Sequence, residues 1–379
     1  MMKTPPEVRA ARLSGEAGGG SIMVEVYALS DVGRTREHNE DAFVVSDLAG
    51  GQPLEFDHAV QQRVGSRGLL FMVADGMGGA AAGELASATA VDVVLRYLRE
   101  HWTSRDVVSP DQFVHTLEHA TQTANGVIYR YAAEHAELRG MGTTATVAGL
   151  LGDTLYLAQV GDSRAYLLRD GQARQLTKDQ SLIQKLVEAG ELTIEEAELS
   201  ERRNIILQAL GPEANIKIDL THQRVRRGDI LLLCSDGLSG IVRSEEIARA
   251  VREEADLPAV CRRLVTMANE LGGPDNITVV AARFEGAGLQ RAADDDEVGH
   301  RVYEAPALRD GDQAELEVLL RERTEQMMRG TPIEPFPAVL TEQREQRQQQ
   351  GLMIRAGLLA AAVLLGLLLV WRFWGRVAG

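Results

Sequence analysis

Residues 69–83 constrain the fold of this chain more than any other stretch. An apolar run, residues 69–74, ends in Asp75-Gly76, and closely spaced glycines follow before a helical pattern begins. A carboxylate at the end of a buried strand suits a hard metal ion, because the strand fixes the carboxylate and glycine lets a backbone carbonyl approach as a further oxygen ligand. The stretch therefore predicts a buried strand that ends at a metal site.

Two other stretches, residues 231–237 and 273–280, place Asp236 and Asp275 where an apolar strand stops or starts. Asp-Gly alone is the commonest hairpin signal, and each of these carboxylates taken singly is more often structural. Their shared setting with Asp75 favours one dinuclear site for phosphate ester hydrolysis. Two metals can hold phosphate oxygens and activate a water, and an all-carboxylate site selects magnesium or manganese.

The order of the elements predicts an α+β fold of two antiparallel sheets covered by helices, since strands cluster first, helices follow and strands return. Strands are expected at residues 22–30, 41–47, 69–74, 143–150, 154–160, 163–169, 217–225, 229–234 and 276–284. Helices are expected from Gly83 and at 110–137, 179–189, 244–252 and 257–271. Residues 143–169 are interpreted as a meander, and 217–234 as a hairpin around Arg227-Gly228.

Charge and cysteine content exclude some classes of protein. The formal net charge of -15 argues against a protein that binds duplex nucleic acid, which needs a basic face. Cys234 and Cys261 lack metal-ligand spacing, which indicates a reducing compartment and no disulfide framework.

The C-terminal region predicts a membrane anchor. Residues 356–371 are apolar, with Arg355 and Arg372 beside them, and we expect a transmembrane helix at 352–374. A buried core helix is the alternative, but such a helix would not follow a polar linker.

The remaining segments complete the predicted organisation. Residues 1–21 are expected to be a flexible leader without a signal peptide, and 286–350 a polar linker with a helix at 313–328. With a late anchor, the domain at 22–285 should lie in the cytoplasm, on a single-pass protein of the cell inner membrane. Basic residues before the span agree with this orientation, whereas Arg372 and Arg376 weaken it.

A series of motifs from residue 24 to residue 284 resembles, in order, the metal-dependent serine/threonine protein phosphatases of type 2C, and the bacterial branch most closely. The matching stretches are residues 30–43, 73–79, 142–147, 160–167, 176–182, 234–238 and 273–280. The resemblance implies a four-layer αββα sandwich, with two manganese or magnesium ions in a cleft at one end and a third, weaker ion beside them.

By motif position, the resemblance also implies roles for the core carboxylates. Asp75 would bridge the two core ions, and the carbonyl of Gly76 would bind the first. Asp236 and Asp275 would bind the second ion.

The same resemblance assigns four residues around this core. Glu40 and Asp41 would lie beside the ions, partly through water. Arg36 matches the arginine that binds the substrate phosphate, and Asp162 matches the ligand of the third ion. An arginine suits this role because its planar fork can grip phosphate with two hydrogen bonds.

The chain departs from the family pattern at two places. Animal members carry a histidine, proposed as general acid, where this chain has Met77, so water or another group must protonate the leaving group. The flap motif, usually Asp-His-Ser, reads Asp179-Gln180-Ser181, and the customary His-Pro before the Arg-Asn pair is absent. We therefore expect substrate choice or behaviour of the third ion to differ.

The function expected from the resemblance is hydrolysis of phosphoserine and phosphothreonine in proteins, by direct attack of a water that bridges two metal ions. A monomeric catalytic domain would oppose a cognate serine/threonine kinase at the membrane, with no role in nucleic-acid binding. Two alternatives stay open: a catalytically silent sensor that holds phosphoproteins, and a phosphatase in a sigma-factor partner-switching pathway. The retained core carboxylates argue against the silent sensor.

Overall fold

The computed structural model describes residues 20–50, 52–103, 108–193, 196–197, 200, 205–290 and 297–304. Its strands are β1 (Met23–Asp31), β2 (Asp41–Asp47), β3 (Val60–Arg63), β4 (Leu69–Met77), β5 (Gly142–Thr143), β6 (Ala145–Leu151), β7 (Thr154–Val160), β8 (Arg164–Arg169), β9 (Gln172–Gln175), β10 (Asp219–Arg224), β11 (Ile230–Cys234) and β12 (Ile277–Glu285). Its helices are α1 (Ala80–His101), α2 (Pro110–Glu134), η1 (Ala136–Leu138), α3 (Leu182–Glu188), α5 (Asp236–Ser239), α6 (Ser244–Glu253) and α7 (Leu257–Glu270).

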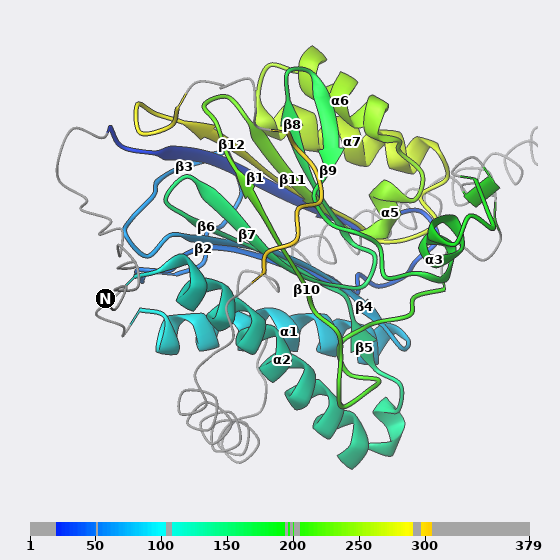
Figure 1. Cartoon of the computed structure of the whole chain (residues 1–379). Helices are drawn as coiled ribbons and strands as arrows, with labels where there is room; N and C mark the ends of the chain where they lie inside the picture. Colours follow the sequence, from blue (N-terminus) through cyan, green and yellow to red (C-terminus); the bar gives the residue numbers. More distant parts are fainter. Residues whose placement is uncertain are drawn as a thin grey trace, which may run out of the picture. The chain divides into compact units, whose positions relative to one another are not determined.

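The strands form two antiparallel sheets that pack face to face. Sheet A has the order β3-β1-β12-β11-β8-β9, and sheet B the order β10-β7-β6-β4-β2, with β5 paired to β4. Helices α6 and α7 cover the outer face of sheet A, whereas α1 and α2 cover that of sheet B (Figure 1). The predicted class, two antiparallel sheets flanked by helices, is therefore confirmed.

The core lies between the sheets and under the helices. Strand β4 is buried from Leu69 to Ala74, because it lies between β2 and β6 with α1 on one side and sheet A on the other. A strand covered on both faces reads as a continuous apolar run, which is why residues 69–74 were recognisable. The large buried side chains include Phe71, Trp102 and Phe284.

Two predicted strand connections are wrong. Strands β10 and β11 do not form a hairpin, since β10 pairs with β7 in sheet B and β11 pairs with β8 and β12 in sheet A. The meander also stops after β7: β6 and β7 pair around Gly152, but at Gly161-Asp162 the chain crosses to sheet A. Turn residues mark where a strand ends, but they do not reveal which sheet the next strand joins.

Several boundaries also differ from the sequence prediction. Strands β3 and β9 were missed because they are short, partly exposed edge strands without an apolar pattern. Helix α3 begins at Leu182, where the side chain of Ser181 accepts a hydrogen bond from the backbone N–H of Gln184. The residues before Ser181 are thereby kept out of the helix.

No helix within the described ranges combines the length and the apolar composition that a bilayer crossing requires. The predicted span at 352–374, the predicted linker helix at 313–328 and most of the predicted leader lie outside the described residues.

Candidate active site

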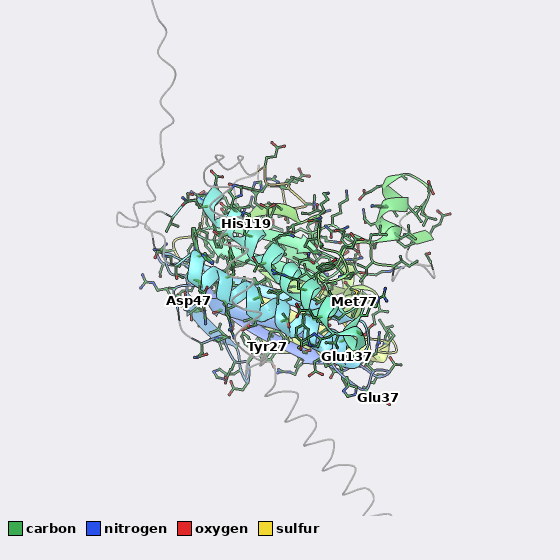
Figure 2. All side chains as sticks on the ribbon, turned by 90° about the horizontal axis from the view of Figure 1, so that it is seen from below. Tyr27, Glu37, Asp47, Met77, His119 and Glu137 are labelled. Atoms are coloured by element: carbon green, nitrogen blue, oxygen red, sulfur yellow. The ribbon has the colours of Figure 1, made fainter. Side chains whose placement is uncertain are left out.

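The predicted carboxylates converge at one end of the two sheets. Asp41 begins β2 and lies directly opposite Asp75 on β4. Asp236 begins α5 just after β11, and Asp275 lies just before β12, the neighbour of β11 in sheet A. Met77 is the last residue of β4, and Asp47 is the last residue of β2. In Figure 2, which views the molecule from below, these two residues lie on opposite sides of the domain.

Backbone and hydroxyl hydrogen bonds hold Asp75 in place. Its N–H donates to Thr144 Oγ1 at 2.9 Å, and its carbonyl accepts from the Thr144 N–H at 2.9 Å and from Thr143 Oγ1 at 2.9 Å. Thr144 Oγ1 also lies 2.8 Å from Ser163 Oγ, next to the crossover between the sheets. Thr143 and Thr144 therefore act as structural supports of the site.

The half-buried carboxylates carry unbalanced negative charge. Burial and the carboxylates of Asp41 and Asp236 raise the pKa of Asp75 well above its ordinary value. Burial, followed by the charge of Asp275, raises the pKa of Asp236. Protons or metal cations bound to such a cluster would relieve its unbalanced charge.

Two deeper carboxylates have oxygens without partners. Burial raises the pKa of Asp41 to about 7, against hydrogen bonds from Thr278 and Ser235. Burial and Asp236 raise the pKa of Asp162 to about 8. Oδ1 of Asp41 and Oδ1 of Asp162 are both buried and accept no hydrogen bond from the described residues. Unsatisfied buried oxygens of this kind are suited to a cation or to ordered water.

The backbone at Gly76 is packed too closely to accept a side chain. A Cβ at Gly76 would collide with the carbonyl oxygens of Gly83 and Glu40, and a Cβ at Gly83 would collide with the carboxylate of Glu40. The carbonyl of Glu40 accepts from the Gly76 N–H at 3.1 Å and from Ser87 Oγ at 2.6 Å. The glycines thus bring Glu40 and the end of β4 together.

Arg36 lies beside the cluster. Its Nη2 donates to Asp275 Oδ2 at 2.7 Å, and half of its side chain is exposed. The loop before it is tied to the same segment: the Arg34 N–H donates to the Gly273 carbonyl at 2.8 Å, and Thr35 Oγ1 to the Pro274 carbonyl at 2.7 Å. The hydrogen bond to Asp275 raises the pKa of Arg36, so this side chain stays charged.

Asn276 and Ser235 connect the two sheets within the site. Asn276 Oδ1 accepts a hydrogen bond from the Glu40 N–H at 2.8 Å, so Asn276 braces this loop. Ser235 Oγ donates to Asp41 Oδ2 at 2.7 Å, a role the sequence analysis missed. Its position directly before Asp236 was the available signal.

Arg164 is a structural ion-pair partner of Asp179. Its Nε donates to Asp179 Oδ1 at 2.9 Å and its Nη2 to Asp179 Oδ2 at 2.7 Å. Gln180, the residue that departs from the family pattern, accepts from the Gly161 N–H at 3.0 Å through Oε1. These contacts fix the turn that carries Asp162.

The donor set fits divalent cations, although the side chains are not arranged as a closed metal site. Within the described part of the chain, no three His, Cys, Asp or Glu side chains are grouped to hold an ion as they stand. Asp275 contacts Arg36 and Asp41 contacts Ser235 instead. The ligands are nevertheless oxygens only, the carboxylates repel one another, and buried oxygens lack partners. Hard ions such as magnesium and manganese prefer such ligands.

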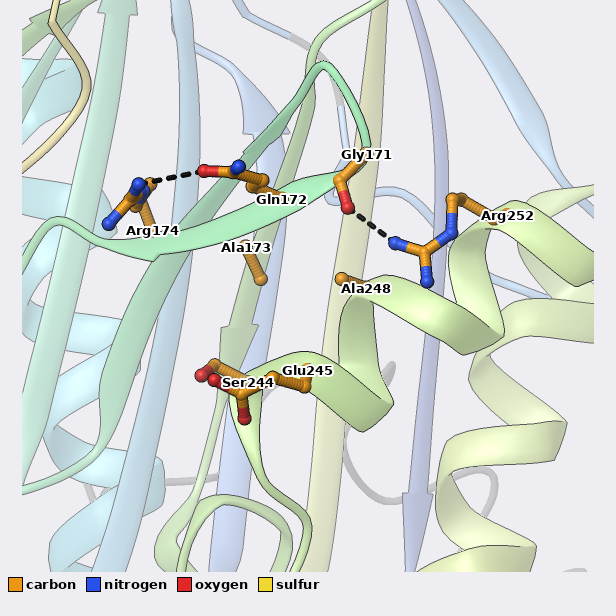
Figure 3. Close-up of a pocket in the computed structure, with 8 residues that line it drawn as sticks. All are labelled: Gly171, Gln172, Ala173, Arg174, Ser244, Glu245, Ala248 and Arg252. Carbon is orange, nitrogen blue, oxygen red and sulfur yellow. Dashed lines mark hydrogen bonds between the residues drawn. The ribbon is translucent and has the colours of Figure 1, made fainter.

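A separate cavity of about 380 Å³ lies between β9 and α6, away from these residues (Figure 3). It is lined by Gly171, Gln172, Ala173, Arg174, Ser244, Glu245, Ala248 and Arg252. Arg252 donates to the Gly171 carbonyl, and Arg174 Nη2 donates to Gln172 Oε1 at 2.7 Å. No residue of the carboxylate cluster lines this cavity, so it is not part of the candidate active site.

Comparisons with known proteins agree on one family. The family described as protein phosphatase 2C matches residues 45–276. The serine/threonine phosphatase stp of Listeria innocua is 37% identical over 252 residues, which are 66% of this chain and 92% of that protein. The serine/threonine protein phosphatase PstP of Mycobacterium tuberculosis is 37% identical over 263 residues, which are 69% of this chain and 45% of that protein.

Solved structures show the same similarity. A serine/threonine phosphatase of S. agalactiae aligns with a TM-score of 0.60 and 32% identity, over 69% of this chain and 99% of that chain. The catalytic domain of PstP in complex with two manganese ions aligns with a TM-score of 0.56 and 34% identity, over 70% of this chain and 99% of that chain.

Proposed function

This chain belongs to the protein phosphatase 2C family and is a protein serine/threonine phosphatase, and from this premise we propose that its carboxylate cluster hydrolyses phosphoserine and phosphothreonine by direct attack of water. The observation that carries the proposal is the convergence of Asp75, Asp236 and Asp275 with Arg36 at one end of the sandwich. Hydrolysis of a phosphate ester requires a water that attacks the phosphorus and groups that hold the phosphate. This site has residues suited to both tasks.

The carboxylates would hold two manganese or magnesium ions. Asp75 on β4 of sheet B, the carbonyl of Gly76, Asp236 and Asp275 are the groups that would hold these ions. When bound, such ions lower the pKa of a water and neutralise the phosphate oxygens. The manganese complex of the related PstP catalytic domain supports this assignment.

Three further carboxylates would complete the site. Asp162 has a buried, unpartnered oxygen that suits a third, weaker ion. Asp41 and Glu40 lie beside the core cluster, where they would orient water or add negative charge. Ser235 holds one oxygen of Asp41 through a hydrogen bond and leaves the other available.

Arg36 would bind the substrate phosphate. It is positioned by Asp275, and half of its side chain is open to solvent. A substrate phosphate can therefore approach donors that Asp275 does not use. The planar guanidinium suits bidentate binding of phosphate, so Arg36 would orient the phosphorus for attack.

The direct test is phosphate release from a phosphothreonine peptide by the full chain, with manganese, with magnesium and with chelator. We expect turnover with either metal and none with chelator. Binding of the peptide without turnover, by folded and metal-loaded protein, would instead favour a phosphoprotein sensor.

For the cellular setting, we propose that the enzyme opposes a serine/threonine kinase, with a phosphatase of a sigma-factor partner-switching pathway as the alternative. The apolar run at 356–371 supports a single membrane span, with the catalytic domain at 22–285 on the cytoplasmic side of the inner membrane. The polar segment at 286–350 would then connect the two.

A further inference from the structure

Residues 297–304, here called the strap, lie along the edge of sheet B. Val302 pairs with Thr221 of β10 in an antiparallel bridge. The His222 N–H donates to the Arg301 carbonyl at 3.0 Å, and the Tyr303 N–H donates to the Leu220 carbonyl at 2.8 Å. In Figure 1 the strap is the orange segment that runs beside β10. The edge of sheet B is thus covered at this point by a segment from a distant part of the chain.

Tyr303 anchors the strap in a seat built from three elements. Its ring meets the rings of Tyr156 on β7 and His222 on β10 edge to face, with centroids 5.4 Å apart in both cases. Its hydroxyl donates to Asp111 in the first turn of α2. Tyr156 is itself buried, so the seat is part of the folded domain. Edge-to-face contacts between aromatic rings add stability beyond the burial of apolar area alone.

The side chains of the strap alternate as in a strand. Val302 is 62% exposed, whereas Arg301 and Tyr303 on either side are partly buried. A further hydrogen bond joins the Gly299 N–H to Gln223 Oε1 at 3.3 Å. The strap is therefore recognised by backbone pairing and by Tyr303, with the Val302 side chain directed to solvent.

Hydrogen bonds continue from β10 towards the candidate active site. Asp219, the first residue of β10, accepts from Gln180 Nε2 at 3.1 Å. Gln180 Oε1 in turn accepts from the Gly161 N–H at 3.0 Å, next to Asp162. The strand that carries the strap is thus joined through Gln180 to the turn at the crossover between the sheets.

We propose that the β10 edge, with Tyr156, His222 and Asp111, is a docking site for an extended, tyrosine-bearing segment, occupied here by the strap of the same chain. Docking adds a strand to an open edge, a general mode of peptide recognition. Occupancy also holds β10 and, through Gln180, the turn at Gly161. The strap lies beyond residues 45–276, which the family model matches, whereas the seat that it occupies lies within them.

The test is amide hydrogen exchange in the full chain with Tyr303→Ala, compared with Val302→Ala as a matched control. In Tyr303→Ala we expect exchange at the His222 amide to accelerate roughly tenfold or more, with a smaller acceleration at Gly161. Val302→Ala should leave both unchanged, because its side chain faces solvent. Tyr303→Phe loses only the hydroxyl contact to Asp111, so its exchange rate at the His222 amide should lie between those of Tyr303→Ala and Val302→Ala.

Addition of a synthetic peptide of residues 297–304 distinguishes docking from general destabilisation. The peptide should restore protection of the His222 amide in Tyr303→Ala. About millimolar peptide is needed, because a separate segment lacks the high effective concentration of a segment in the same chain. The same peptide with Tyr303→Ala should not. Unchanged exchange at His222 in the protein variant, or no rescue by the intact peptide, would overturn the docking site. Acceleration at His222 alone would overturn the connection to Gly161.

Discussion

At the scale of single residues, Arg36 is held beside the carboxylates by its own loop. This loop is hydrogen bonded to residues 273–275, the segment that contains Asp275. Thr35 and Arg34 hydrogen bond to residues 273 and 274, and Arg36 itself to Asp275. The position of the guanidinium is thus set before any substrate arrives. Such preorganisation reduces the ordering that substrate binding would otherwise require.

Replacing Arg36 should weaken phosphate binding more than it weakens folding. For Arg36→Lys, which keeps the charge but loses the planar fork, we expect KM for a phosphothreonine peptide to rise about tenfold, and more for Arg36→Ala. Arg34→Lys is the matched control, because Arg34 contributes a backbone hydrogen bond to this loop. Steady-state kinetics with manganese measures the effect, and an unchanged KM in both Arg36 variants would remove Arg36 from the phosphate site.

The buried carboxylates predict how metal-free protein responds to pH. Asp41 and Asp162 have pKa values of about 7 and about 8 in the fold, above the ordinary 3.8, so the folded state keeps protons that the unfolded state has lost. The free energy of unfolding of metal-free protein should therefore fall as pH rises from about 5 to about 8. Bound manganese should reverse the loss, because it replaces the protons.

Thermal unfolding with chelator and with manganese, at about pH 5.5 and about pH 8, measures this effect. Asp162→Asn, which resembles the protonated carboxyl, should reduce the dependence of the metal-free protein on pH. Two results together would contradict the assignment of buried carboxylates with raised pKa values. The metal-free protein would become more stable from about pH 5.5 to about pH 8, and Asp162→Asn would not change this dependence.

At the scale of elements, the crossover from β7 to β8 positions Asp162. Gly161 has φ of +98°, and a Cβ there would lie 2.6 Å from Thr144 Cγ2. Thr144 in turn supports Asp75. The crossover therefore connects the fold of the two sheets directly to the site.

Gly161→Ala and Gly152→Ala form a matched pair, because both glycines have positive φ but only Gly161 is closely packed. A Cβ at Gly152, which has φ of +59°, would meet nothing within 4 Å. We expect Gly152→Ala to cost about 1 kcal/mol and Gly161→Ala about 1–3 kcal/mol more, since overpacking adds to backbone strain. Denaturant unfolding measures both, and equal losses would show that the contact with Thr144 is unimportant.

The sequence allowed the buried strands and the carboxylates at their ends to be predicted, because an apolar run such as 69–74 has the length of a strand and has Gly68 and Gly76 at its ends. It did not allow the pairing of β10 with β7, since a local turn such as Arg227-Gly228 contains no information on long-range pairing. The candidate site residues were proposed from motifs. The brace from Ser235 to Asp41 was not, because it depends on two segments far apart in the chain.

At the scale of the whole molecule, the C-terminal apolar run should determine where the enzyme is found. Removing residues 351–379 should release the protein from lipid vesicles without loss of activity on a phosphothreonine peptide. Leu365→Arg in the full chain, a charge in the middle of the run, should weaken membrane association, because a central arginine costs about 2.5–3.5 kcal/mol on insertion scales. Cosedimentation with vesicles measures both.

A truncated protein that stays with the vesicles would contradict the anchor. A truncated protein that is folded and metal-loaded yet inactive would show that the C-terminal region contributes to catalysis.

The most direct test of the central claim compares Asp236→Asn with Asp170→Asn in the full chain. Both residues precede glycine, but Asp170 lies in the exposed turn between β8 and β9. Manganese binding by calorimetry and phosphate release from a phosphothreonine peptide would be measured for each. We predict that Asp236→Asn lowers both by about 100-fold or more and that Asp170→Asn changes neither. Wild-type metal binding and turnover in a folded Asp236→Asn variant would contradict the proposed site.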